Sequence, residues 1–172
     1  MKKLKALFVS LFIAGVSTTA SAQGGDFDYI NVGVGVSGWG IPLYVGVDKT
    51  IADKITVGGV LSAQRKTERW GLLGSDFRWV HTIIGIGANA NYHILEPTDE
   101  FDIYGGATLG YYFWNTRSTE SGAITYTGGG SGGFGLGLQV GGRYDIEKVV
   151  VHAELGFGTV FSSARVGVSF PF

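Results

Sequence analysis

Alternation of apolar residues with small or polar ones, at a period of two, constrains this chain more than any other feature. In YINVGVGV at 29–36, every second residue is Ile or Val, and the residues between them are Tyr, Asn and Gly. A period of two places the two sets on opposite faces of a β-strand. No long segment after residue 22 shows the 3.6-residue period of a helix, so the chain is predicted to be all-β.

Eight runs of this type follow one another, separated by turn residues. They are Phe27–Ser37, Leu43–Ile51, Lys54–Gln64, Trp79–Ile94, Phe101–Asn115, Phe134–Ile146, Lys148–Val160 and Ala164–Phe172. The connections alternate between short turns and longer ones, among them the polar segments 65–78 and 116–133. Long connections at every second position gather at one end of an antiparallel sheet. The pattern therefore predicts an eight-stranded up-and-down barrel.

The composition indicates which face of this barrel is wet. Charged residues make up 16% of the chain, against about 25% in ordinary soluble domains. The polar face of the runs is mostly Gly, Asn, Ser and His, whereas a solvated sheet surface needs many Lys and Glu. Such a face suits a narrow lumen, so the prediction is a transmembrane β-barrel with its apolar face in lipid. A soluble lipocalin-like carrier, with the faces reversed, is the alternative that alternation alone permits.

The first residues have the anatomy of a secretory signal peptide. A basic start with three lysines precedes the apolar segment 6–16, and Ala20-Ser21-Ala22 forms a cleavage site. We therefore expect a cleaved signal peptide at 1–22 and a barrel domain at 23–172. Lysine and arginine (13) are balanced by aspartate and glutamate (14). Without a basic stripe, no nucleic-acid partner is expected.

Aromatic residues are predicted to form bands at the two membrane interfaces. With the N-terminus at the periplasmic end, one set falls at the outer end of the runs. The predicted outer aromatic girdle is Trp39, Trp79, Tyr111 and Trp114.

The few charges within the runs are predicted to form a lumenal network of ion pairs and hydrogen bonds. A charge in a narrow interior of low dielectric constant must be paired. We expect Glu154 to lie near an inward arginine. The predicted members are Gln139, Arg143, Asp145, His152, Glu154 and Arg165.

Several motifs suggest chemistry but lack the context that it needs. GVGVSG at 33–38 has the spacing of a dinucleotide fingerprint, but another strand follows where a helix is required. The Gly-rich segment 127–137 lacks the G-K-[ST] of a phosphate loop. His81 and His93 are roughly 40 Å apart along one strand, and His152 has no cysteine or carboxylate cluster nearby, so no metal is expected. His152 and Glu154 share a face, but no G-x-S-x-G elbow accompanies them. We expect no cofactor and no catalytic residue.

The end of the chain carries a resemblance to a known family. DIEKVVVHAELGFG at 145–158 followed by ARVGVSFPF at 164–172 looks like the last hairpin of the small eight-stranded outer-membrane barrels, the OmpX-, OmpA- and OmpW-like proteins. The resemblance implies that the barrel-assembly machinery recognises a C-terminal signal with Phe170 and Phe172. It also implies a location in the bacterial outer membrane, in contact with the lipid bilayer and lipopolysaccharide.

This resemblance leaves several functions open. The leading one is a non-enzymatic structural or surface-interaction role, with an extracellular partner bound through the outer loops 65–78 and 116–133. A narrow channel for small solutes or hydrophobic molecules, as in OmpW-like relatives, is the alternative. A lipid-modifying barrel enzyme is a third possibility, of lower rank.

Overall fold

The structure is a computed structural model. It describes residues 28–72, 75–95, 100–120, 125–127, 130–146, 149–158 and 164–171. The expected signal peptide at 1–22 and the terminal Phe172 lie outside the described residues. Within the described ranges, no helix is long and apolar enough to cross a membrane.

The described chain is built from β-strands. They are β1 (Asp28–Val36), β2 (Leu43–Ala52), β3 (Ile55–Leu72), β4 (Ser75–His93), β5 (Phe101–Glu120), β6 (Thr125–Thr127), β7 (Ser131–Ile146), β8 (Val149–Gly158) and β9 (Ala164–Pro171). All except β6 correspond to the eight predicted runs. At the inner end, the predicted and observed strand ends agree within one residue.

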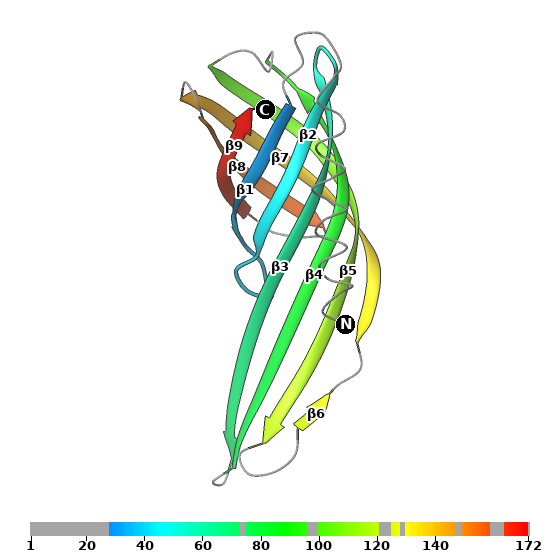
Figure 1. Cartoon of the computed structure of the whole chain (residues 1–172), viewed down its shortest axis with the longest axis vertical. Helices are drawn as coiled ribbons and strands as arrows, with labels where there is room; N and C mark the ends of the chain where they lie inside the picture. The colour runs from blue at the N-terminus through cyan, green and yellow to red at the C-terminus, as the bar shows by residue number, and fades with distance from the viewer. Residues whose placement is uncertain are drawn as a thin grey trace.

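The strands close into a tilted barrel (Figure 1). Their order is β4-β3-β2-β1-β9-β8-β7-β5, and a pairing between β4 and β5 completes the ring. Neighbouring strands are antiparallel, and the short β6 adds to the outer end of β5. The predicted all-β, eight-stranded antiparallel up-and-down barrel is therefore confirmed.

The register keeps each face of the sheet consistent around the ring. Val32 of β1 lies opposite Val45 of β2 and Val168 of β9, while Gly33 lies opposite Tyr44 and Gly167. Because side chains alternate along each strand, the valines all face outward and the glycines with Tyr44 face inward.

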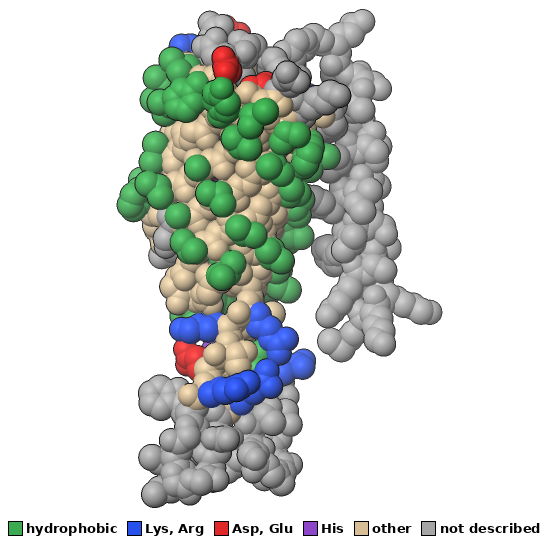
Figure 2. All heavy atoms as spheres, turned by 90° about the vertical axis from the view of Figure 1, so that its left-hand side faces the viewer, with side chains coloured by type: hydrophobic (Ala, Val, Ile, Leu, Met, Phe, Trp, Pro, Cys, Tyr) green, Lys and Arg blue, Asp and Glu red, His purple; other side chains and the backbone are tan. Residues whose placement is uncertain are grey.

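The outward face is apolar and the inward face is polar. Aliphatic side chains on the outside are exposed; Val34, Leu109 and Leu136, for example, are 42%, 59% and 60% exposed. Asn31, Asp48 and several other polar residues are buried inside. Figure 2 shows hydrophobic side chains spread over the barrel wall. This distribution is the reverse of that in a soluble lipocalin-like barrel.

At the outer end, β3, β4 and β5 run beyond the other strands and form what we term the outer projection, residues 65–72, 75–82 and 115–120 (Figure 1). The prediction of long outer loops at 65–78 and 116–133 was therefore wrong over most of these segments. Residues 65–72 pair with 75–82 in a regular ladder. RKTER at 65–69 has polar residues on both faces, so hydrophobic alternation cannot reveal the strand.

Candidate functional site

The inner half of the lumen is filled by charged and hydrogen-bonding side chains that we term the plug. Its members come from six strands. They are Asn31, Tyr44, Asp48, Tyr104, Arg143, His152, Glu154, Arg165 and Ser169. The free space among the side chains in this region is about 20 Å³. That volume holds about one water molecule.

Arg143 and Asp48 form the first ion pair of the plug. Asp48 also accepts a hydrogen bond from the amide nitrogen of Asn31 at 2.8 Å. The Arg143 guanidinium lies between two rings, 5.1 Å from the centre of Tyr104 and 5.4 Å from that of Tyr29. Cation–π contacts and a direct ion pair together compensate for taking this charge out of water.

Glu154 and Arg165 form the second ion pair, directly opposite each other on β8 and β9. The pair is bidentate: Nε of Arg165 lies 2.7 Å from Oε1 of Glu154, and Nη2 lies 2.8 Å from Oε2. The Tyr104 hydroxyl donates to the same Oε2 at 3.1 Å. Two arginines and two carboxylates leave the plug with balanced charge.

His152 links the remaining polar groups. The Ser169 hydroxyl donates to Oδ1 of Asn31, so its oxygen accepts from Nδ1 of His152 at 2.9 Å. Nε2 of His152 then accepts from the Tyr44 hydroxyl, which leaves a neutral imidazole. Ser169 is fully buried, and Glu154 bonds Arg165 and Tyr104 rather than His152. These groups do not form a nucleophile–base relay.

Glycines make room for the large inward side chains. A Cβ on Gly33 or Gly167 would collide with the Tyr44 hydroxyl and with backbone atoms of the neighbouring strand. A Cβ on Gly141 would collide with the Tyr104 ring. Gly33 of GVGVSG therefore reflects close packing inside the barrel, whereas a Cβ on Gly38 would meet no atom within 4 Å.

Two smaller clusters flank the plug. His93 hydrogen-bonds Asp102 through Nδ1 at 2.6 Å and Thr56 through Nε2 at 2.9 Å. Gln139 accepts from Thr108 and donates to Asn91, both at 2.8 Å. Within the described residues, no group of three or more His, Cys, Asp or Glu could hold a metal ion.

The structure places the predicted network residues in different positions. Arg143, His152, Glu154 and Arg165 lie in the plug, with Glu154 beside an inward arginine as expected. Gln139 belongs to the adjoining cluster. Asp145 differs from the prediction, because its side chain is exposed at the inner rim, one residue before β7 ends.

The predicted lumenal network lacks Asp48, Asn31, Tyr44 and Tyr104, which supply much of the plug. On its own strand, each of these residues alternates with the outward-facing apolar residues, so alternation places its side chain on the lumenal face. What the sequence lacks is the register between strands. Only the register brings Asp48 of β2 within reach of Arg143 of β7.

The outer half of the lumen instead holds an open cavity of about 450 Å³, which we term the outer cavity. It is bounded by the β1–β2 turn and by β3, β4 and β5. Its lining residues are Trp39, Ser62, Gln64, His81, Ile83, Gly85, Tyr112, Trp114 and Thr116.

Aromatic rings form the walls of the outer cavity. Tyr112 and Trp114 are stacked, with ring centres 5.4 Å apart and planes 25° apart. Across from them, Trp39 contacts His81 edge-on at 6.1 Å. His81 is also hydrogen-bonded to Thr116 at 2.9 Å.

This geometry corrects the predicted outer girdle. Trp114 and Trp39 line the cavity, and Trp79 shares the inward face of β4 with His81. Only Tyr111 of the four faces outward, packed against Phe113 and Phe134 with ring centres 4.7 and 4.8 Å away. Depth along the strand sets only the distance of a residue from the membrane interface. Alternation along the strand decides whether its side chain faces the lipid or the lumen.

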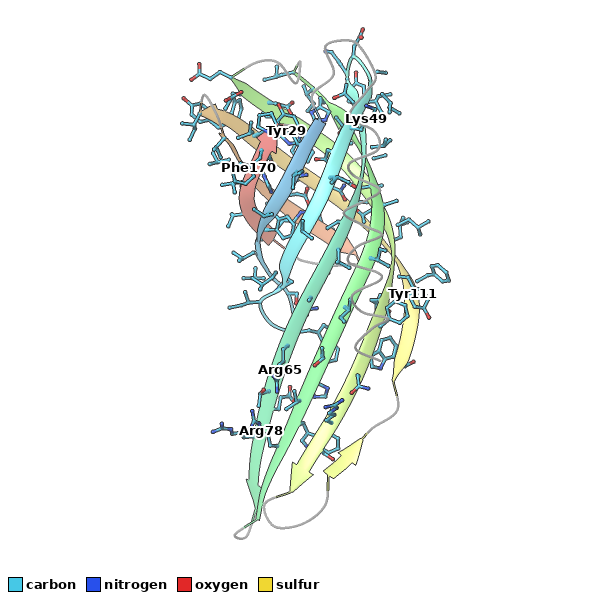
Figure 3. All side chains as sticks on the ribbon, viewed as in Figure 1. Tyr29, Lys49, Arg65, Arg78, Tyr111 and Phe170 are labelled. Carbon is cyan, nitrogen blue, oxygen red and sulfur yellow. The ribbon has the colours of Figure 1, made fainter. Side chains whose placement is uncertain are left out.

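An outward-facing cluster of arginines lies just beyond the apolar wall, and we term it the basic belt: Arg65, Arg69, Arg78 and Arg117. All four side chains are exposed, and Arg69 lies directly opposite Arg78. Figure 2 shows Lys and Arg side chains gathered below the hydrophobic wall, and Figure 3 labels Arg65 and Arg78 there. Among the side chains that the structure describes, no carboxylate forms an ion pair with these four.

A closed eight-stranded barrel with an apolar wall, a polar interior and strands extended at one end has the fold of the small outer-membrane β-barrels. The N-terminal β-barrel domain of Pseudomonas aeruginosa OprF is similar, with a TM-score of 0.52 and 14% identity over 86% of this chain and 97% of that domain. Neisserial surface protein A (NspA) is similar at a TM-score of 0.51 and 18% identity, over 86% of this chain and 95% of that one. No family model and no curated protein matches the sequence.

Proposed function

We propose that this protein is a non-enzymatic barrel of the bacterial outer membrane, closed to solutes, that presents its outer projection to the cell exterior. The plug is the observation that carries the proposal. Charged and hydrogen-bonding side chains from six strands fill the inner lumen and leave about 20 Å³ free. A hydrated solute needs a continuous path, and paired buried charges resist displacement. The plug therefore disfavours the narrow-channel alternative.

Conductance in planar lipid bilayers tests this proposal. The purified full barrel is expected to give no steady current, while a known porin in the same bilayer gives discrete steps. Reproducible single-channel steps from this protein would contradict the closed barrel and restore the channel function.

The basic belt supports a contact with lipopolysaccharide at the outer leaflet. Like charges directly opposite each other on a sheet are destabilising, as for Arg69 and Arg78. Phosphate groups on the lipid would compensate them through charge-assisted hydrogen bonds.

Unfolding in vesicles with and without lipopolysaccharide tests this contact. Lipopolysaccharide is expected to stabilise the native protein and to lose that effect on a variant with all four belt arginines changed to Gln. Lys54→Gln, at the inner end of β3, is the matched control and should keep the effect. If lipopolysaccharide stabilised both variants equally, the basic belt would not be its binding site.

The C-terminal strand supports recognition by the barrel-assembly machinery. Phe170 faces outward at the inner end of β9 and is 42% exposed. We expect deletion of Phe172 to lower the amount of folded barrel in the outer membrane. Heat-modifiable migration on gels measures that amount, and an unchanged yield would argue against a C-terminal signal.

A further inference from the structure

We infer that the outer cavity binds a neutral saccharide ring, with its flat face on the aromatic wall and its hydroxyls toward the polar side chains. The inference does not depend on whether the barrel conducts. The volume of the outer cavity, about 450 Å³, is within the range of small-molecule pockets. Such pockets are concave and mostly apolar, with a few placed polar groups.

The lining residues favour an uncharged ligand. Among the residues that the structure describes, the lining includes no Asp, Glu, Lys or Arg. Lys66 lies 5.9 Å from the Trp39 ring centre but is already paired with Glu68 at 2.9 Å. A charged ligand would lose its hydration without gaining an opposite charge.

The aromatic walls favour a ring with a flat apolar face. Tyr112 and Trp114 are stacked with their ring planes 25° apart, so the two rings hold each other in place as a rigid aromatic wall. Aromatic side chains offer a large rigid contact area at low conformational cost. One face of a pyranose ring carries mostly C–H groups, and it packs well against such a surface.

The polar groups favour hydroxyls at the edge of that ring. Oε1 of Gln64 accepts a hydrogen bond from Ser37 at 2.6 Å, so the amide nitrogen remains to donate. Ser62 and Thr116 contribute hydroxyls, which both donate and accept. A purely hydrophobic molecule would leave the amide nitrogen of Gln64 and the hydroxyl of Ser62 without partners, at a cost in affinity.

Tryptophan side-chain NMR tests the site directly. The full barrel is prepared in dodecylphosphocholine micelles, because detergents with sugar head groups would compete. Glucose, galactose, N-acetylglucosamine and their disaccharides are titrated. We expect the indole N–H signals of Trp39 and Trp114 to shift at concentrations on the order of millimolar, and that of Trp79, outside the cavity lining, to stay unchanged.

Three variants separate the site from general surface effects. Trp114→Ala and Gln64→Leu should each weaken sugar binding by about tenfold or more. Trp79→Ala, on the inward face of the same barrel, should leave it within about twofold. Heat-modifiable migration confirms that each variant is folded.

Three results would overturn the inference. The first is no shift with any sugar of the panel. The second is a shift on adding free indole as a ligand but on adding no sugar, which would make the site a pocket for flat aromatic molecules. The third is sugar binding that persists in folded Trp114→Ala, which would place the sugar elsewhere on the barrel.

Discussion

The inner and outer halves of the lumen belong to the same closed sheet, yet they hold opposite kinds of chemistry. In the inner half, Arg143 pairs with Asp48 and Arg165 with Glu154, and the side chains leave almost no free space. The outer half is a cavity of about 450 Å³ with aromatic, amide and hydroxyl walls. Alternation assigns a residue to the lumen in both halves, but it does not say whether the lumen is filled there.

The difference follows from what lies across the barrel. In the inner half all eight strands are present, so an inward side chain such as Tyr104 meets an opposite wall. Gly141, its partner on the neighbouring strand β7, leaves space for the Tyr104 ring. Toward the outer end β1 stops at Val36 and β8 at Gly158, while β3, β4 and β5 continue. Within the described residues, the inward side chains of the long strands then share a cavity with Trp39 of the β1–β2 turn.

Removing one charge from the plug should have the largest effect on stability. Arg143→Met leaves Asp48 buried without its cation, which we expect to lower the free energy of unfolding by about 3–5 kcal/mol. Urea unfolding in lipid vesicles, followed by tryptophan fluorescence, measures the change. Arg78→Met removes an exposed arginine that has no ion pair with any described side chain, and it should change stability by less than about 0.5 kcal/mol.

Equal effects of these two substitutions would show that the inner lumen is hydrated and that its charges are screened. The comparison between a filled inner half and an open outer half would then fail.

Two inward tyrosines of β5 compare the two halves on one strand. Tyr104 is 2% exposed and hydrogen-bonded to Glu154, whereas Tyr112 lines the outer cavity. We expect Tyr104→Ala to cost about 3 kcal/mol or more, because it opens a cavity in the plug. Tyr112→Ala enlarges an existing cavity and should cost about 1 kcal/mol. The same urea experiment would refute this ordering if Tyr112→Ala were the costlier change.

The sequence predicted the barrel because its evidence is local. Each strand carries its own two-residue alternation, and the order of short and long connections sets the topology. The plug depends instead on register around the ring. Arg143 and Asp48 are 95 residues apart in the chain, and nothing in either strand alone indicates the pairing. The outer projection was missed for a different reason, because RKTER of β3 and NTRSTE of β5 lack an apolar face.

Adjacent glycines of β7 test how tightly the plug is packed. Gly141 faces inward, where a Cβ would collide with the Tyr104 ring, whereas at Gly142 the nearest atom is the Asp102 carbonyl oxygen at an ordinary 3.6 Å. Gly141→Ala should lower stability by about 1–3 kcal/mol through overpacking. Gly142→Ala should stay within about 0.5 kcal/mol of the native protein. If both substitutions proved neutral, the Tyr104 ring would have room to move, and the inner lumen would be looser than described.

The smallest effect is expected for the ion pair between Lys66 and Glu68, which lie two residues apart on the same face of β3. Lys66 and Glu68 lie 2.9 Å apart, with side chains 39% and 37% exposed. The hydrogen bond from Lys66 and its charge hold the pKa of Glu68 below its ordinary value. A carboxylate with a lowered pKa stabilises the fold at neutral pH and loses that contribution as the pH falls through the lowered pKa. Exposed pairs contribute little, because solvent screens them.

Lys66→Met should therefore return the pKa of Glu68 toward its ordinary value while leaving the urea midpoint at neutral pH unchanged. NMR titration of the Glu68 side chain measures the first quantity, and the unfolding curve measures the second. A clear loss of stability would mean that the outer projection, like the plug, is held by its charges. The contrast between the two halves would then concern packing alone, because both would depend on paired charges for their stability.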